Sequence, residues 1–176
     1  MIFIKWPLLL TSVFPLLLLG QALSVPPKLV PVSGFDLNRY LGKWHEIVRL
    51  PNSFEKDLVN VTATYSLRND GKVKVVNEGY KKTKSGKHQV AVGKAKFAKT
   101  ADKGHLRVSF FWIFYADYII VELDPEYEYA MVASSHKYLW ILSRKPKMDN
   151  AVLDKLVKKA QELGFDTTKL YFTPQE

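Results

Sequence analysis

Residues 38–49 read Asn-Arg-Tyr-Leu-Gly-Lys-Trp-His-Glu-Ile-Val-Arg, with the triplet Gly42-x-Trp44 at their centre. The triplet follows a short polar turn and leads into an alternating stretch, which is typical of a strand with one buried face. A Gly-x-Trp triplet alone occurs by chance in many chains. Here a second element, Tyr138-Leu-Trp-Ile-Leu-Ser-Arg144-x-Pro146, lies downstream, and the pair is far more specific than either part.

Short alternating runs separated by turn residues recur from residue 59 onward and predict an all-β chain. The clearest hairpin is joined by Asn69-Asp70-Gly71, because Asp-Gly between alternating runs suits a tight turn. We predict strands at 43–50, 61–68, 72–82, 89–98, 105–111, 117–124, 127–134 and 138–144. About eight antiparallel strands can close into a barrel, whose interior either fills with side chains or holds one small ligand.

The period of the apolar residues changes after Pro146. Apolar side chains then recur every three or four residues between Asp149, a helix N-cap, and Gly164, a C-cap: Val152, Leu153, Leu156, Val157, Ala160 and Leu163. This pattern predicts one amphipathic helix, packed on the outside of the barrel with its apolar stripe buried.

The composition favours a single basic domain. The chain of 176 residues carries 26 Lys and Arg against 17 Asp and Glu, a net charge of +9. Such a surface attracts nucleic acid, anionic lipid head groups or acidic polysaccharide, and charge alone does not choose between them. The chain has no cysteine, which excludes disulfides, thiolate nucleophiles and thiolate metal sites.

The amino terminus has the layout of a secretory signal peptide. Lys5 precedes an apolar run, and small residues follow, so we predict a signal over 1–22 with cleavage after Ala22 rather than after Ser24. Removing this segment, whose single charge is that of Lys5, lowers the net charge by one to +8. A retained anchor is the alternative. We predict an extended, proline-containing linker over 23–34 and the folded domain over 35–176.

The chain resembles the lipocalin family, in the branch that holds the bacterial outer-membrane lipocalins and apolipoprotein D. The resemblance rests on 35–36, 39–47, 61–68, 77–80, 93–97, 108–111 and 138–144. It implies an eight-stranded antiparallel up-and-down barrel with a C-terminal α-helix packed outside. It also implies that Gly42, Trp44 and Arg144 form a barrel-closing signature, in which the arginine lies over the indole as a cation–π pair.

The same resemblance implies a ligand cavity that binds fatty acid or lysophospholipid, stored or carried for maintenance of the cell envelope. With Trp44 and Arg144 fixing the phase of their strands, the resemblance implies that the lining is Ala63, Tyr65, Val75, Asn77, Ala95, Phe97, Phe110, Tyr138 and Trp140. Each of these has an alternative role as ordinary core, because small barrels often fill themselves.

Two departures from the family pattern concern location and motif. Lipoproteins of this branch end their signal in Leu-x-Gly/Ala-Cys, but Leu18-Leu-Gly-Gln21 has glutamine in place of the cysteine. A thioether lipid anchor is therefore excluded, and we expect an exported protein in the periplasm or associated with the outer membrane. The middle motif, often Thr-Asp-Tyr, is Ala116-Asp117-Tyr118.

Catalysis has little support in the sequence, and we expect no enzyme, cofactor or metal. The four histidines, His45, His88, His105 and His136, lie on separate predicted strands or turns, and no Gly-x-Ser-x-Gly elbow occurs. Two other functions stay open: a structural or stress protein without a ligand, and a basic binder of anionic polymers. We expect no nucleic acid partner for an exported chain, and leave open contact with an anionic membrane surface and a homodimer.

Overall fold

The computed structural model describes residues 26–176, so the predicted signal peptide lies outside the described residues. The strands are β1 Gly42–Arg49, β2 Leu58–Leu67, β3 Val73–Lys81, β4 His88–Phe97, β5 His105–Phe111, β6 Phe114–Leu123, β7 Tyr129–Ser135, β8 Tyr138–Ser143 and β9 Tyr171–Phe172. The helices are α1 Leu37–Tyr40, α2 Asn150–Glu162 and the 3-10 turn Thr167–Lys169.

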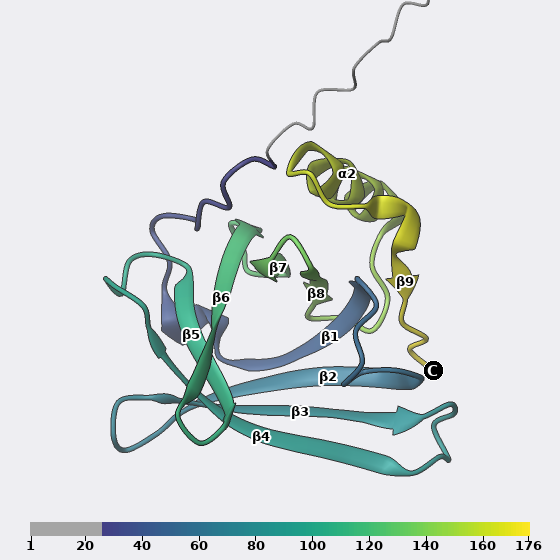
Figure 1. Cartoon of the computed structure of the whole chain (residues 1–176), viewed down its shortest axis with the longest axis horizontal. Helices are drawn as coiled ribbons and strands as arrows, with labels where there is room; N and C mark the ends of the chain where they lie inside the picture. The colour runs from purple at the N-terminus through teal and green to yellow at the C-terminus, as the bar shows by residue number, and fades with distance from the viewer. Residues whose placement is uncertain (1–25) are drawn as a thin grey trace, which may run out of the picture.

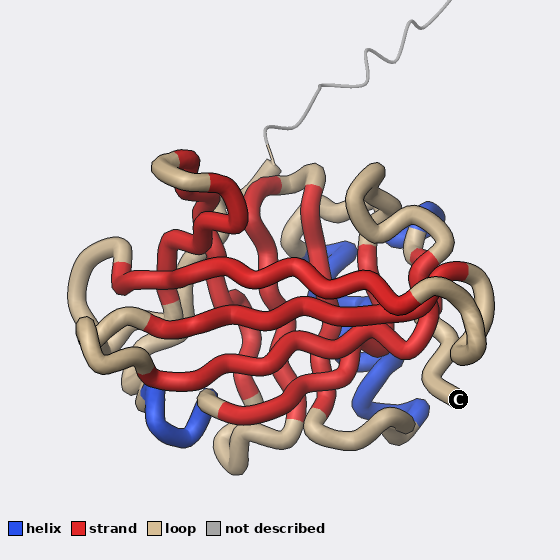
Figure 2. The backbone as a smooth tube through the Cα atoms, turned by 90° about the horizontal axis from the view of Figure 1, so that it is seen from below, coloured by secondary structure: helices blue, strands red, loops and turns tan. Residues whose placement is uncertain are grey.

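Strands β1 to β8 form a closed antiparallel barrel (Figure 1), as the sequence predicts. Each strand pairs with the next along the chain, and β1 closes the ring by pairing with β2 on one edge and β8 on the other. Seen from below, the long strands in front run across those behind (Figure 2). Strand β9 adds to β1 and was not predicted, because two residues are too short to show an alternation.

Helix α2 covers the outside of the barrel, which confirms the prediction from its apolar period. The Asp149 side chain accepts hydrogen bonds from the first amides of the helix and caps it. Leu156 and Ala160 are fully buried against the outer face of the sheet, which includes Met131 and Ile141.

The described part of the expected linker, 26–34, is extended and hydrogen-bonded to the barrel. The Val32 amide donates to the Ile120 carbonyl at 2.9 Å, and the Val32 carbonyl accepts from the Gly104 amide at 2.9 Å. A Cβ on Gly104 would lie 2.7 Å from Val32, so only glycine permits this close approach. The segment therefore adds contacts to the domain before Phe35.

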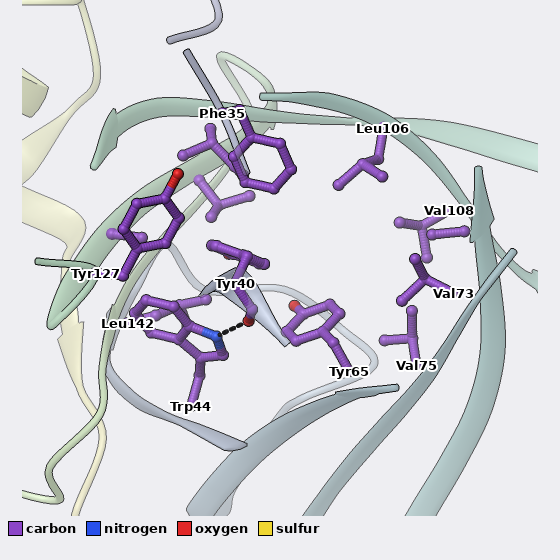
Figure 3. Close-up of a cluster of buried hydrophobic side chains, with 14 residues drawn as sticks. Phe35, Tyr40, Trp44, Tyr65, Val73, Val75, Leu106, Val108, Tyr127 and Leu142 are labelled. Atoms are coloured by element: carbon purple, nitrogen blue, oxygen red, sulfur yellow. Dashed lines mark hydrogen bonds between the residues drawn. The ribbon is translucent and has the colours of Figure 1, made fainter. Parts of the chain in front are cut away.

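The closed end of the barrel is built on Trp44, which is completely buried (Figure 3). Its indole donates to the Tyr40 carbonyl at 2.8 Å, and the Arg144 guanidinium lies 3.9 Å from the ring centroid. Arg144 also donates to the carbonyls of Arg39, Lys43 and Tyr127. The predicted cation–π pair is thus confirmed, and one side chain ties together three segments of the floor.

Gly42 is required beside this contact for two reasons. Its φ is +96°, a region that side chains other than glycine rarely adopt, and a Cβ would lie 3.3 Å from the guanidinium of Arg144. In the Gly-x-Trp signature the glycine therefore leaves room for the guanidinium of Arg144, and the tryptophan ring contacts the same guanidinium.

We expect Arg144→Met to lower the free energy of unfolding by about 2–3 kcal/mol, because the cation–π contact and three charged hydrogen bonds are lost. Urea unfolding followed by circular dichroism measures this change. Lys147→Met, at an exposed position three residues further along the chain, is the matched control and should change stability little. Equal stability of the two variants would contradict the role given to Arg144.

Candidate functional site

The barrel encloses a cavity of about 530 Å³ that opens at the end opposite Trp44. This volume lies within the range of about 300–1,000 Å³ that small-molecule sites occupy. The wall is mostly apolar, with members from all eight barrel strands, including Val61, Val75, Val108, Val132 and Leu142. The barrel is therefore not filled by its own side chains.

Seven of the nine residues that we placed in the cavity from the sequence lie in its wall: Ala63, Tyr65, Val75, Asn77, Phe110, Tyr138 and Trp140. The other two, Ala95 and Phe97, belong to the packed cluster beneath the cavity, on the part of β4 that is nearest the floor. Ala95 pairs with Val73 and Val108, and Phe97 packs against the floor side chain Phe35. These two residues support the bottom of the cavity.

Three tyrosine hydroxyls form a chain at the bottom of the cavity. The Tyr118 hydroxyl lies 2.7 Å from that of Tyr40 and 2.7 Å from that of Tyr65. Burial raises the pKa of all three phenols above the ordinary value, so they remain neutral. The hydroxyls satisfy one another, and Tyr65 and Tyr118 present their rings to the cavity.

A buried charged cluster lies in the wall near β1. Arg49 donates to the Glu46 carboxylate, to the Thr173 hydroxyl at 3.0 Å and to the Glu55 carbonyl at 2.7 Å. The Glu55 carboxylate accepts from the Trp140 indole at 3.0 Å. Burial, followed by the charge of Glu55, raises the pKa of Glu46 to about 7 against the opposing effect of Arg49. The Glu46 carboxyl is thus buried beside a second acidic group, which favours keeping its proton.

Charges are distributed differently inside the cavity and around its mouth. The lining contains four acidic residues, Glu46, Glu55, Glu78 and Asp117, and within residues 26–176 it contains no lysine, arginine or histidine. The four loops at the mouth, 50–57, 82–87, 112–113 and 136–137, carry five lysines: Lys56, Lys82, Lys84, Lys87 and Lys137. Acidic side chains in the wall, three of them paired with Arg49, His88 and His105, therefore lie behind a rim of lysines.

Several residues of the wall were not placed there from the sequence. Small residues widen the cavity at Gly79, Ala91 and Ala116. Their alternation with neighbouring residues could have placed them in the wall from the sequence. Glu46 and Glu55 carried no such signal. A carboxylate inside a barrel is compatible with folding only because Arg49 lies beside it, and that contact crosses a bulge in β1.

The described residues contain no arrangement with evident catalytic or metal chemistry. No group of three metal-ligating side chains occurs within 26–176. The histidines have separate partners: Gln175 for His45, Glu78 for His88, Asp117 for His105 and the Leu163 carbonyl for His136. None of the helices in this part of the chain has the length and apolar character needed to span a membrane.

Comparison with known proteins gives a consistent result. The model of the lipocalin-like domain matches residues 35–175. Outer membrane lipoprotein Blc of Vibrio cholerae is 47% identical over 161 residues, covering 90% of this chain and 94% of the relative. Apolipoprotein D of Macaca fascicularis is 32% identical over 167 residues, covering 90% and 84%. Insecticyanin of Manduca sexta has the same fold, with a TM-score of 0.70 at 22% identity, covering 86% and 87%.

We expect stability to fall as the pH rises from about 5 to 8. The pKa of Glu46 is higher in the folded chain than the ordinary glutamate value, so the folded state holds a proton that the unfolded state has lost. This contribution is complete below the unfolded pKa and is lost as the pH passes the folded value of about 7. Its size is on the order of 3 kcal/mol.

Urea midpoints at several pH values measure this dependence. Glu46→Gln should flatten it, because the amide mimics the protonated acid, whereas the exposed Glu162→Gln should leave it unchanged. The same slope in wild type and Glu46→Gln would show that another group is responsible.

Proposed function

The chain belongs to the lipocalin family, and from that membership and its open cavity we propose that it binds a single-chain lipid, a fatty acid or a lysophospholipid, in the barrel. The observation that carries the proposal is the cavity of about 530 Å³ with its largely apolar wall. Each methylene that leaves water for such a wall gains about 0.8 kcal/mol. Binding without turnover is the mechanism, since the cavity offers a largely preformed apolar surface.

The charges orient the ligand in this proposal. The acyl tail extends toward the floor, where the tyrosine hydroxyls are bonded to one another, and the head group lies near the lysines of the mouth. A carboxylate is repelled by Glu55 inside and is attracted by the lysines outside. A lysophospholipid suits both regions better, since glycerol separates its phosphate from the acyl chain, so that the phosphate lies among the lysines of the rim and away from the carboxyls of the wall.

The cell envelope is the proposed location. The relative from Vibrio cholerae is named an outer membrane lipoprotein, and this chain has no cysteine for a thioether anchor. We therefore propose that the protein is exported and stores or carries lipid in the envelope for membrane maintenance.

Native mass spectrometry of the protein purified from its host, with extraction of bound lipid, tests the proposal. We expect a fatty acid or lysophospholipid that added lysolipid displaces in a one-to-one ratio. Lysophosphatidylethanolamine should bind more tightly than the fatty acid of the same chain length. A barrel that is empty and takes up neither amphiphile would favour a structural role and overturn the proposal.

We expect Ala63→Trp to abolish lipid uptake while the barrel remains folded, because the indole enters the cavity from the middle of β2. Displacement of a fluorescent acyl probe measures uptake, and circular dichroism checks the fold. Ala151→Trp adds the same ring at an exposed position on α2 and should bind as wild type does. Wild-type affinity in Ala63→Trp would contradict the assignment of the interior.

A further inference from the structure

The tip of the β5–β6 hairpin exposes a run of large apolar side chains. Phe111, Trp112, Ile113 and Phe114 are 71%, 80%, 72% and 69% exposed. They form a tight turn at the mouth of the barrel, and Trp112 adopts a positive φ of 48° there. Bulky side chains rarely take that conformation, and burial of so much apolar surface is normally favourable. The hairpin therefore presents a surface that lacks a partner within the described chain.

The neighbouring strand widens this surface. Strand β4 pairs with β3 along almost its whole length, but its pairing with β5 is confined to Lys94–Phe97. Within residues 26–176, positions 88–93 have no strand on that side, and Val90 and Val92 are more than half exposed there. Figure 1 shows β4 diverging from the β5–β6 hairpin.

The cavity reaches this divergence. Val90 and Ala91 from β4 and Phe110 and Ala116 from the hairpin all belong to its wall. Phe110 belongs both to the wall and to the apolar run that continues to Phe114. The apolar surface is thus continuous from outside the barrel to its interior.

Basic side chains lie directly behind the apolar tip. Lys94, Lys96 and Arg107 surround the Tyr115 ring at 5.9, 4.9 and 6.0 Å from its centroid. Lys82, Lys84 and Lys87 follow in the next loop of the mouth, where Lys84 donates to the carbonyl of Glu176. The acidic residue nearest in sequence to the tip of the hairpin is Asp117, which is bonded to His105.

We propose that the β5–β6 hairpin and the free edge of β4 dock on an anionic lipid bilayer, so that lipid passes between bilayer and cavity without crossing water. An apolar tip with cations behind it matches a membrane interface, where an apolar interior lies beneath negative head groups. Tryptophan suits this boundary, since its ring is apolar and its N–H is polar. The inference rests on the proposed lipid-binding function.

The test uses the exported protein purified from its host, so that all variants share the same amino terminus. The hairpin variant, Trp112→Asn with Ile113→Ser, replaces the two apolar side chains of the turn with polar ones, and neither residue lines the cavity. Val30→Ser with Leu67→Ser is the matched control, because both side chains are exposed and lie outside the hairpin. Equal urea midpoints establish that the variants are folded.

Two measurements are made with each protein. Co-sedimentation with vesicles of phosphatidylethanolamine and phosphatidylglycerol gives docking, and vesicles with phosphatidylcholine in place of phosphatidylglycerol give the charge dependence. Transfer of a fluorescent lysophospholipid from vesicles to protein gives the route. For wild type and control we expect docking that weakens with salt, and a transfer rate that rises with vesicle concentration.

For the hairpin variant we expect docking and transfer to fall about tenfold or more, because two large apolar side chains no longer enter the interface. Its affinity for monomeric lysophospholipid in solution should equal that of wild type. Unchanged docking and transfer in this variant would overturn the inference and leave the proposed function intact. Failure of every protein to take up lipid in solution would instead overturn the proposed function.

A second copy of the chain is the competing occupant. Sedimentation velocity without lipid distinguishes it: a wild-type dimer that the hairpin variant cannot form would overturn membrane docking. A monomer in both proteins supports the inference.

Discussion

The contact between the Arg144 guanidinium and the Trp44 indole is the constraint on which the rest of the barrel depends. It joins the first strand to the segment that follows the eighth, and its hydrogen bonds reach the carbonyls of Arg39, Lys43 and Tyr127. Because one end is closed in this way, the large aromatic side chains can pack there and leave the other end open. The cavity is a consequence of an uneven distribution of side-chain volume along one closed sheet.

Alternation and turn chemistry were sufficient to predict the eight strands, and the three- and four-residue apolar period was sufficient for the outer helix. The closing pair was predicted from the resemblance to the family. Depth inside the barrel was harder to predict. Alternation tells which face a side chain occupies but not how far it lies from the floor, so Ala95 and Phe97 were placed in the cavity although they lie beneath it. Strand β9 depends on a long-range contact with β1. The Glu46–Arg49 pair depends on a bulge in β1 that breaks the alternation, and the local pattern records neither feature.

The net charge of the chain indicates only that its surface is basic, whereas the structure places the lysines at the rim and the acidic side chains in the wall of the cavity. The wall is apolar with a few acidic side chains and the rim carries lysines, and an amphiphile that enters must pass from the rim to the wall. The apolar hairpin is next to this boundary. Such a protein selects its ligand by the order in which the ligand meets the lysines of the rim, the apolar hairpin and the cavity. The apolar wall by itself accepts any acyl chain that fits.

The pairing of β1 with both β2 and β8 also determines the order in which the chain acquires its structure. A ribosome delivers β1 early, but one edge of this strand has no partner until residues 138–143 emerge nearly a hundred positions later. Contacts of such long sequence separation form slowly, and an open strand edge invites pairing with other chains meanwhile. The barrel is therefore completed only when almost the whole chain is present. This order suits a polypeptide that folds after its synthesis has ended. The chain needs a chaperone most during the interval before β1 and β8 pair.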